Sequence, residues 1–210
     1  MTEEIEQYIK QHSQKEDPLL TRLNRDANVK LLNPRMVSGH IQGRLLSMIS
    51  YMIRPKRILE IGTYVGYSAM CLAEGLAEGG KVITIDIDEE IEDMARAYIE
   101  QSEYVDKIDF RIADALKLIP ELDEVFDLVF IDGDKREYKA YYEASYDKLH
   151  QGGFMLIDNT LWNGKVLNPA ASWDHQTQAL IEFNDFLAAD ERVDRFILDL
   201  RDGLTFVRKR

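Results

Sequence analysis

Short apolar runs alternate with amphipathic helical patterns along most of the chain, which indicates an α/β fold. Seven runs of five to seven residues predict strands, at 57–61, 81–87, 107–112, 125–131, 153–158, 195–200 and 204–208. The clearest helix is predicted over 88–101, where Asp88 can cap the N-terminus and one face carries Ile91, Met94, Ala95, Tyr98 and Ile99. Strands that alternate with helices predict a mainly parallel sheet with right-handed crossovers and helices on both faces.

The two ends of the chain depart from this alternation. The last two strands are joined only by a turn around Asp202-Gly203, which is too short for a crossover helix, so they must pair antiparallel. Residues 1–55 precede the first strand, carry a helical pattern and are expected to cover the active-site crevice. The chain shows no internal repeat and no linker, so residues 1–210 are expected to form a single domain.

Polar side chains follow two of the buried strands directly. "FDLVFIDGDK" ends in Asp132, Asp134 and Lys135, and "FMLIDN" ends in Asp158 and Asn159. Two carboxylates and an amide oxygen form a hard, all-oxygen set that suits Mg²⁺, Mn²⁺ or Ca²⁺, whereas zinc would prefer histidine or cysteine. Taken alone, the first motif is better explained as a solvated turn and the second as a helix cap.

A glycine turn follows the first strand, in "EIGTYVGYSAMCLA". Gly62 and Gly66 allow a ligand to approach the backbone, but the dinucleotide motif G-x-G-x-x-G is absent. A carboxylate at Glu60 fits an ammonium better than a pyrophosphate, and Asp86 ends the next strand where ribose hydroxyls are usually bound. These positions favour S-adenosylmethionine (SAM), with its ammonium at Glu60 and its carboxylate near Ser68. The plainer alternative is a generic turn with ordinary charges at the strand ends.

Composition excludes several classes of partner. The 210 residues carry a net charge of −12, which argues against nucleic acid and against anionic membrane surfaces. No apolar run approaches the roughly 20 residues that span a bilayer, and the acidic start "MTEEIEQYIK" is unlike a secretory signal. Cys71 is the single cysteine, so a disulfide within the chain is impossible and a reducing, cytoplasmic location is expected.

Four segments in the expected order resemble the cation-dependent O-methyltransferases, the family of the catechol and caffeoyl-CoA O-methyltransferases. They are "LEIGTYVGYSA", "FDLVFIDGDKREY", "GGFMLIDNTLWNGKV" and "LDLRDGLTFVRK", and the resemblance extends from about Leu32 to the C-terminus. It implies a Rossmann-like class I methyltransferase fold with strand order 3-2-1-4-5-7-6. In that order the ends of the fourth and fifth strands lie side by side. The resemblance also implies a homodimer and a small phenolic substrate with vicinal hydroxyls, free or linked to CoA.

Matching the family motifs implies a role for particular residues. Asp132, Asp158 and Asn159 correspond to the metal ligands, Lys135 to the general base, and Asp132 also borders the cofactor. Met36 and Val37 match the segment over the methionine part of SAM, and Asp114 and Ala115 match the segment at the adenine. The chain departs from the usual pattern at three positions: Asp86 replaces a longer Glu, Ala113 a common Gly, and Gly133 a common Ala.

Several assignments stay open. Lys135 is either the base or a surface partner of Asp134, and Trp162 either walls the acceptor pocket or packs in the core. His40 fits a structural role better than a catalytic one, and Trp173 and His175 have no assignment. Arg22, Arg25, Lys30 and Arg35 would suit the phosphates of a CoA substrate, or form a solvated face. The competing functions are a non-catalytic SAM-binding regulator and, less favoured, an NAD-dependent oxidoreductase.

Overall fold

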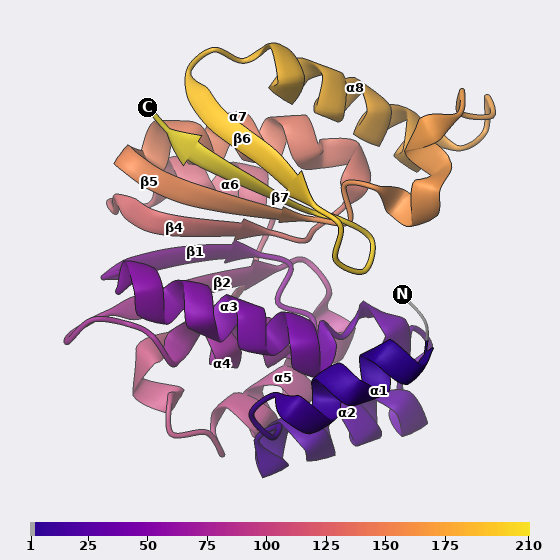
Figure 1. Cartoon of the computed structure of the whole chain (residues 1–210). Helices are drawn as coiled ribbons and strands as arrows, with labels where there is room; N and C mark the ends of the chain where they lie inside the picture. Colours follow the sequence, from indigo (N-terminus) through magenta and orange to yellow (C-terminus); the bar gives the residue numbers. More distant parts are fainter. Residues whose placement is uncertain (1–2) are drawn as a thin grey trace.

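The computed structural model describes residues 3–210, which form a seven-stranded sheet with helices on both faces (Figure 1). The strands are β1 (Arg57–Ile61), β2 (Lys81–Asp86), β3 (Ile108–Ile112), β4 (Phe126–Ile131), β5 (Leu149–Asp158), β6 (Val193–Leu198) and β7 (Leu204–Lys209). Their order is β3-β2-β1-β4-β5-β7-β6. β1 to β5 pair in parallel, and β7 pairs antiparallel with both β5 and β6. The expected strand order and C-terminal hairpin are confirmed.

Helices surround this sheet. Before β1 lie α1 (Glu3–His12), α2 (Pro18–Lys30), the 3₁₀ turn η1 (Pro34–Met36) and α3 (Gly39–Ile53). The later helices are α4 (Tyr67–Ala73), α5 (Glu92–Ile99), α6 (Ala115–Glu121), α7 (Tyr138–Lys148) and α8 (His175–Ala189), with 3₁₀ turns η2 (Glu89–Ile91), η3 (Val105–Lys107), η4 (Lys135–Glu137) and η5 (Trp162–Leu167). Among residues 3–210, no helix has both the length and the apolar character needed to cross a membrane.

Three predicted elements differ from the structure by more than one residue at an end, and the other strands by at most one. The helix expected over 88–101 begins as the 3₁₀ turn η2 and is α-helical only in α5, although Asp88 does cap it by accepting from the Glu90 N–H. β5 begins at Leu149, before the expected start, because Leu149 pairs with Phe126 ahead of an irregularity in the β4–β5 register. β6 covers 193–198 instead of 195–200, because Val193 already pairs with Lys209 and the chain then turns toward Gly203.

Alternation along the strands divides the core into two layers. Ile58, Leu128 and Phe130 point to one face, where they pack with apolar residues of α2 to α5. Leu59 and Val129 point to the other face, against α6, α7 and α8. Figure 1 shows this division, with α3 in front of the sheet and α6 and α7 behind it. A parallel sheet buried on both faces explains why its strands are almost continuously apolar.

The parallel register places four isoleucines in one row across the sheet. Ile61 pairs with Ile85 on one side and with Ile131 on the other, and Ile131 pairs with Ile157. All four belong to the core layer against α6 to α8. The residues that follow them in the chain are Gly62, Asp86, Asp132 and Asp158. Successive side chains of a strand point to opposite faces, so this second row is directed toward the face that carries α3.

Asp190, directly after α8, links α7 to the start of β6. Its carboxylate accepts from the Tyr142 hydroxyl at 2.8 Å and from the Arg192 Nε and backbone N–H, both at 2.9 Å. The Arg192 guanidinium holds the pKa of this carboxyl well below its usual range. The ionised Asp190 carboxylate therefore stabilises the fold fully above its unfolded-state pKa of about 4, and this stabilisation is lost as the pH falls below that value.

We expect Asp190→Ala to lower the free energy of unfolding at pH 7 by about 1–3 kcal/mol, because the buried Tyr142 hydroxyl loses its acceptor. Urea unfolding measures this. Asp194→Ala is the matched control, because Asp194 is half exposed and pairs with the exposed Arg208 and Arg210. Its cost should stay below about 1 kcal/mol. Equal unfolding midpoints for Asp190→Ala and the wild type would contradict the role of this link.

Candidate active site

A cavity of about 1060 Å³ opens at the carboxyl ends of the central strands. Its walls come from the segment Leu32–Ser38, the turn after β1, the ends of β2, β4 and β5, and the β6–β7 turn. Cavities for single small molecules usually measure about 300–1,000 Å³, so this one has room for a cofactor together with a substrate. The predicted site residues that line it are Met36, Val37, Gly62, Ser68, Asp86, Asp114, Ala115, Asp132, Lys135, Asp158 and Asn159. Glu60 and Gly66 do not line it.

The turn after β1 brings two strand ends into contact. Gly62 has a φ of 98°, and a Cβ built on it would lie 2.2 Å from the Asp132 carbonyl oxygen. The Gly62 N–H donates to Ile85, and the Asp132 N–H donates to Ile61, both at 2.8 Å. Only glycine fits this crossing of the β1 and β4 ends. Gly66, also left-handed at φ 82°, precedes α4 and shapes the turn behind the cavity wall.

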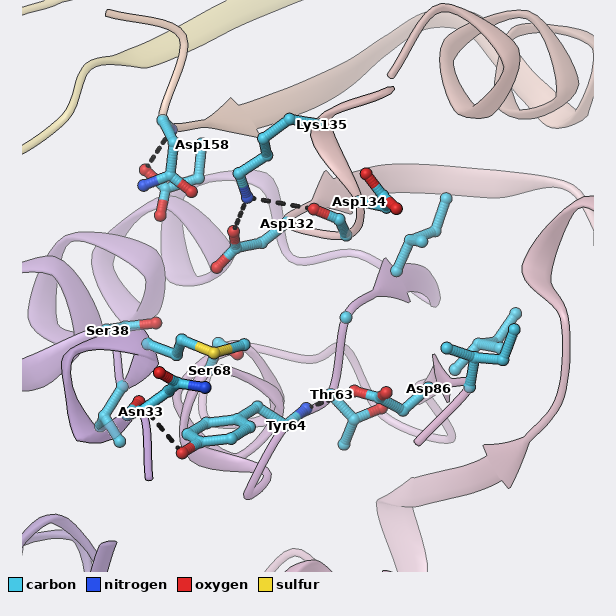
Figure 2. A pocket seen from close by; sticks show the side chains of 18 of the residues that line it. Asn33, Ser38, Thr63, Tyr64, Ser68, Asp86, Asp132, Asp134, Lys135 and Asp158 are labelled. Carbon is cyan, nitrogen blue, oxygen red and sulfur yellow. Dashed lines mark hydrogen bonds and ion pairs between the residues drawn. The ribbon is translucent and has the colours of Figure 1, made fainter. Parts of the chain in front are cut away.

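Asp86 is held by the backbone of the glycine turn. One carboxylate oxygen accepts from the Tyr64 N–H at 2.7 Å and the other from the Asp88 N–H at 3.0 Å (Figure 2). Each oxygen keeps a second lone pair that can accept from a ligand hydroxyl. Tyr64 itself has a φ of 47°, and its hydroxyl donates to the Asn33 carbonyl at 3.1 Å. The shorter carboxylate of Asp86 thus lies at the cavity wall.

Glu60 is fully buried in β1, one residue before the isoleucine row. Its Oε2 accepts from the Thr84 hydroxyl at 2.5 Å, and its Oε1 has no hydrogen-bond partner among the described residues. Burial raises the pKa of this carboxyl to about 8, with the charges of Asp132 and Asp86 acting in the same direction. A buried carboxylate with an unpaired oxygen is costly unless a donor or a cation reaches it. The observation fits a cationic ligand group.

Lys135 lies inside the site and not on the surface. The residue is 8% exposed, and its ammonium donates to Asp132 Oδ1 at 2.9 Å and to the Gly133 carbonyl at 3.1 Å. Figure 2 shows it directed between Asp132 and Asp158. Asp134 instead binds the Arg136 guanidinium. The alternative of a surface ion pair between Lys135 and Asp134 is therefore wrong.

Asp158 is the most deeply buried carboxylate of the cavity wall, at 3% exposure. Its Oδ2 accepts from Gln42 Nε2 at 2.7 Å and its Oδ1 from the Asn159 N–H at 2.9 Å. Burial, together with the nearby negative charge of Asp132, raises the pKa of Asp158 to about 6. Like charges held together in this way are stabilised by a bound cation.

The donor set fits a divalent cation. Within residues 3–210, no group of three His, Cys, Asp or Glu side chains is placed to hold a metal, so a cation at this edge would need the Asn159 amide beside the carboxylates of Asp132 and Asp158. Asn159 has a φ of 60°, a left-handed conformation that asparagine tolerates better than most residues. Oxygen ligands alone suit Mg²⁺, Mn²⁺ or Ca²⁺, and three of them leave positions open for water or substrate.

Other predicted residues divide between the site and the surface. Asp114 caps α6 by accepting from the Leu116 N–H at 3.0 Å, and Arg35 alone of the four basic candidates lines the cavity. Trp162 lines it too, with Lys135 Nζ 5.9 Å from its ring. Three other candidates do not line the cavity: His40, Trp173 and His175. The His40 ring is hydrogen-bonded to the Gln14 carbonyl, and Trp173 is 78% exposed.

The cavity wall also contains residues that the sequence did not single out. Those that line it are Tyr64, Tyr141, Gln176 and Arg201. Gln42 lies behind the wall and donates to the cavity-lining Asp158. Tyr64 and Arg201 lie in segments that resemble the family, but the resemblance gave neither of them a role. Both have a positive φ, of 47° and 51°, and this signal is visible only in the structure.

The strand order, the antiparallel hairpin and a cavity at the carboxyl ends of the strands together define a class I methyltransferase fold. Residues 10–210 match the family model described as O-methyltransferase. The chain is 35% identical over 185 residues to caffeoyl-CoA O-methyltransferase 2 of Eucalyptus globulus, covering 83% of this chain and 75% of that protein. The protein belongs to the O-methyltransferase family.

Two solved structures show the same likeness in three dimensions. The O-methyltransferase from Bacillus cereus, crystallised with SAH, has a TM-score of 0.88 at 29% identity, covering 99% of this chain and 97% of that one. The O-methyltransferase TomG from Streptomyces achromogenes, crystallised with SAM, has a TM-score of 0.91 at 26% identity, covering 100% of this chain and 99% of that one.

Glu60 gives a prediction about stability. Because its folded pKa lies above the ordinary value, the ionised carboxylate destabilises the fold, and the free energy of unfolding falls as the pH rises from about 4 to about 8. Glu60→Gln should remove this loss and stabilise the ligand-free protein at pH 9 by about 1–3 kcal/mol. Urea unfolding at pH 5 and pH 9 measures it. The same pH dependence in the variant and the wild type would show that Glu60 is not the group responsible.

Proposed function

We propose that the protein transfers the methyl group of SAM to one hydroxyl of a vicinal dihydroxyphenyl compound, free or linked to CoA, with the help of a divalent cation. One observation carries the proposal. Two kinds of site share a single cavity: a glycine turn beside Asp86, which suits a nucleoside, and a buried oxygen cluster with a lysine, which suits a cation and an acidic hydroxyl. The relatives crystallised with SAM or SAH support the choice of cofactor.

The cofactor half of the cavity is assigned as follows. Asp86 accepts from the ribose hydroxyls, and Asp114 with Ala115 borders the adenine. Glu60, whose Oε1 has no partner among the described residues but which lies behind the residues that line the cavity, would accept from the ammonium of the methionine part, and Ser68 would bind its carboxylate. Met36 and Val37 cover this part from the Leu32–Ser38 segment, and Asp132 borders both halves.

In the acceptor half, Asp132, Asp158 and Asn159 would hold the cation, and Lys135 acts as the base. A divalent cation supplies positive charge that favours the phenolate over the phenol. Neutral Lys135 Nζ, held beside Asp132 and the Gly133 carbonyl, would accept the hydroxyl proton after the ammonium that donates to these two groups has lost one proton to solvent. The oxygen then forms a bond to the methyl carbon as the carbon–sulfur bond breaks, leaving SAH. Since both molecules are held in one cavity, the protein's main contribution is their alignment.

The first test is methyl transfer from SAM to 3,4-dihydroxybenzoate, followed by mass spectrometry, with Mg²⁺ and with excess EDTA. We expect turnover with Mg²⁺, its loss with EDTA and its return when metal is added back. Cofactor binding without turnover on any catechol would favour the non-catalytic alternative. Failure to bind SAM at all, measured by calorimetry, would overturn the proposal.

Asp158→Ala tests the proposed metal site separately from the cofactor site. Removing one of two carboxylates should lower metal-dependent turnover by at least about 100-fold, while the Kd for SAM stays within a few fold. The exposed Asp185→Ala on α8 is the control and should behave as the wild type. Unchanged turnover in Asp158→Ala would remove Asp158 from the proposed metal site.

Glu60→Gln tests the cofactor half. Loss of the charged acceptor should weaken SAM binding by about 10- to 100-fold, because hydrogen bonds to charged groups contribute about 1.5–3 kcal/mol. Calorimetric titration with SAM at pH 7.5 measures this, because the α-ammonium of SAM, with a pKa of about 8, is largely protonated there and its charge favours ionised Glu60 in the complex. Equal affinities would contradict an ammonium contact at Glu60.

The homodimer and the cytoplasmic location stay predictions. Sedimentation analysis of the purified protein would test the homodimer.

A further inference from the structure

Two polar residues to which the sequence assigned no role form a hydrogen-bonded chain that ends on Asp158. The first is Gln42 in α3, which is 1% exposed and whose Nε2 donates to Asp158 Oδ2 at 2.7 Å. The two residues are 116 positions apart in the chain. Burying an amide in this way is costly unless its donors and acceptor are used. The contact therefore needs an explanation beyond core packing.

The second residue is Arg201, in the turn between β6 and β7. Its Nη1 donates to Gln42 Oε1 at 3.0 Å, to the Val37 carbonyl at 3.2 Å and to the Ser38 carbonyl. Its Nη2 donates to the Arg35 carbonyl at 3.2 Å. All four acceptors are neutral oxygens. One guanidinium thus joins the C-terminal hairpin, helix α3 and the segment that carries Met36 and Val37 over the cavity.

Arg201 determines which way the Gln42 amide faces. A guanidinium has only donors, so the amide oxygen must be directed toward it, and the amide NH₂ is then left for Asp158. The reversed amide would place its oxygen against a carboxylate and its NH₂ against a guanidinium. The two contacts of Gln42 therefore reinforce each other, and one orientation is strongly preferred.

Asp158 is consequently fixed at both oxygens. Gln42 holds Oδ2 and the Asn159 N–H holds Oδ1, and each oxygen keeps one further lone pair directed elsewhere. A carboxylate held in this way cannot rotate freely about its Cβ–Cγ bond. Partners of this kind orient a ligating carboxylate and raise the affinity of the site for its ion.

We propose that Gln42 is a positioning residue for Asp158 and that Arg201 positions Gln42, so that an exposed turn of the C-terminal hairpin controls divalent-cation affinity. The inference rests on the proposed function, because it takes Asp158 as a metal ligand. Gln42 acts on the cation half of the cavity alone. Arg201 acts on both halves, since it also binds the backbone of residues 35–38.

The test is calorimetric titration of the full chain with Mn²⁺ and, separately, with SAM. Gln42→Met keeps the length of the side chain but removes the donor, and we expect its Kd for Mn²⁺ to rise about 10- to 100-fold while its Kd for SAM changes less than about twofold. Turnover of Gln42→Met should recover at saturating metal, which a general loss of structure would not allow. Unchanged Mn²⁺ affinity would overturn the proposal.

Arg201→Lys provides a second test, at an exposed position in the β6–β7 turn. Lysine keeps the charge but cannot bind four acceptors together, so both Kd values should rise. If the two residues act in one chain, Arg201→Lys should add little further loss of Mn²⁺ affinity to Gln42→Met. Fully additive losses would show that Arg201 does not act through Gln42 and would overturn that part of the inference.

Two controls keep the outcomes apart. Gln178→Met, on the exposed face of α8, removes a similar contact from an amide to the Glu182 carboxylate and should leave both affinities unchanged. A wild-type protein that binds SAM but no divalent cation would overturn the metal assignment in the proposed function, and this inference with it. A wild type that binds Mn²⁺ no better than Gln42→Met would overturn the positioning role alone.

Discussion

The site depends on the parallel register of the central strands. Because Ile61, Ile85, Ile131 and Ile157 lie in one row, the residues after them reach the same edge of the sheet together. A slip of one residue in any strand would turn its aspartate toward the opposite core layer. The apolar packing of the isoleucines against α6 to α8 therefore positions Asp86, Asp132 and Asp158, although none of those helices supplies the carboxylates.

Crowding acidic groups at this edge has a cost that the surrounding residues only partly offset. Lys135 pairs with Asp132, Gln42 donates to Asp158, and backbone N–H groups hold Asp86. The raised pKa values of Glu60 and Asp158 show that repulsion and burial remain. Functional sites commonly contain carboxylates whose repulsion and burial destabilise the fold, and bound cationic groups can offset this cost. On the proposed function, the SAM ammonium and the divalent cation are those groups.

The ends of the chain complete the cavity from outside the sheet. The segment Leu32–Ser38 forms one wall, and Arg201 in the β6–β7 turn binds its carbonyl oxygens. Tyr64 adds a bond from the glycine turn to Asn33. The wall that covers the cofactor half is thus attached to the sheet at two places, and neither attachment is a local contact in the sequence.

The sequence by itself determined the strand pattern, the antiparallel hairpin and the acidic strand ends, because strand periodicity and turn chemistry are local properties. The family resemblance supplied the strand order. Only the tertiary structure decided that Lys135 is buried against Asp132, that Glu60 has an unpaired oxygen behind the cavity wall, and that Gln42 holds Asp158. Lys135 and Asp132 are only three residues apart, but the burial of their ion pair, like that of Glu60, depends on how the surrounding elements pack. Gln42 and Asp158 are 116 positions apart, and no local pattern of residue types encodes a contact between such distant segments.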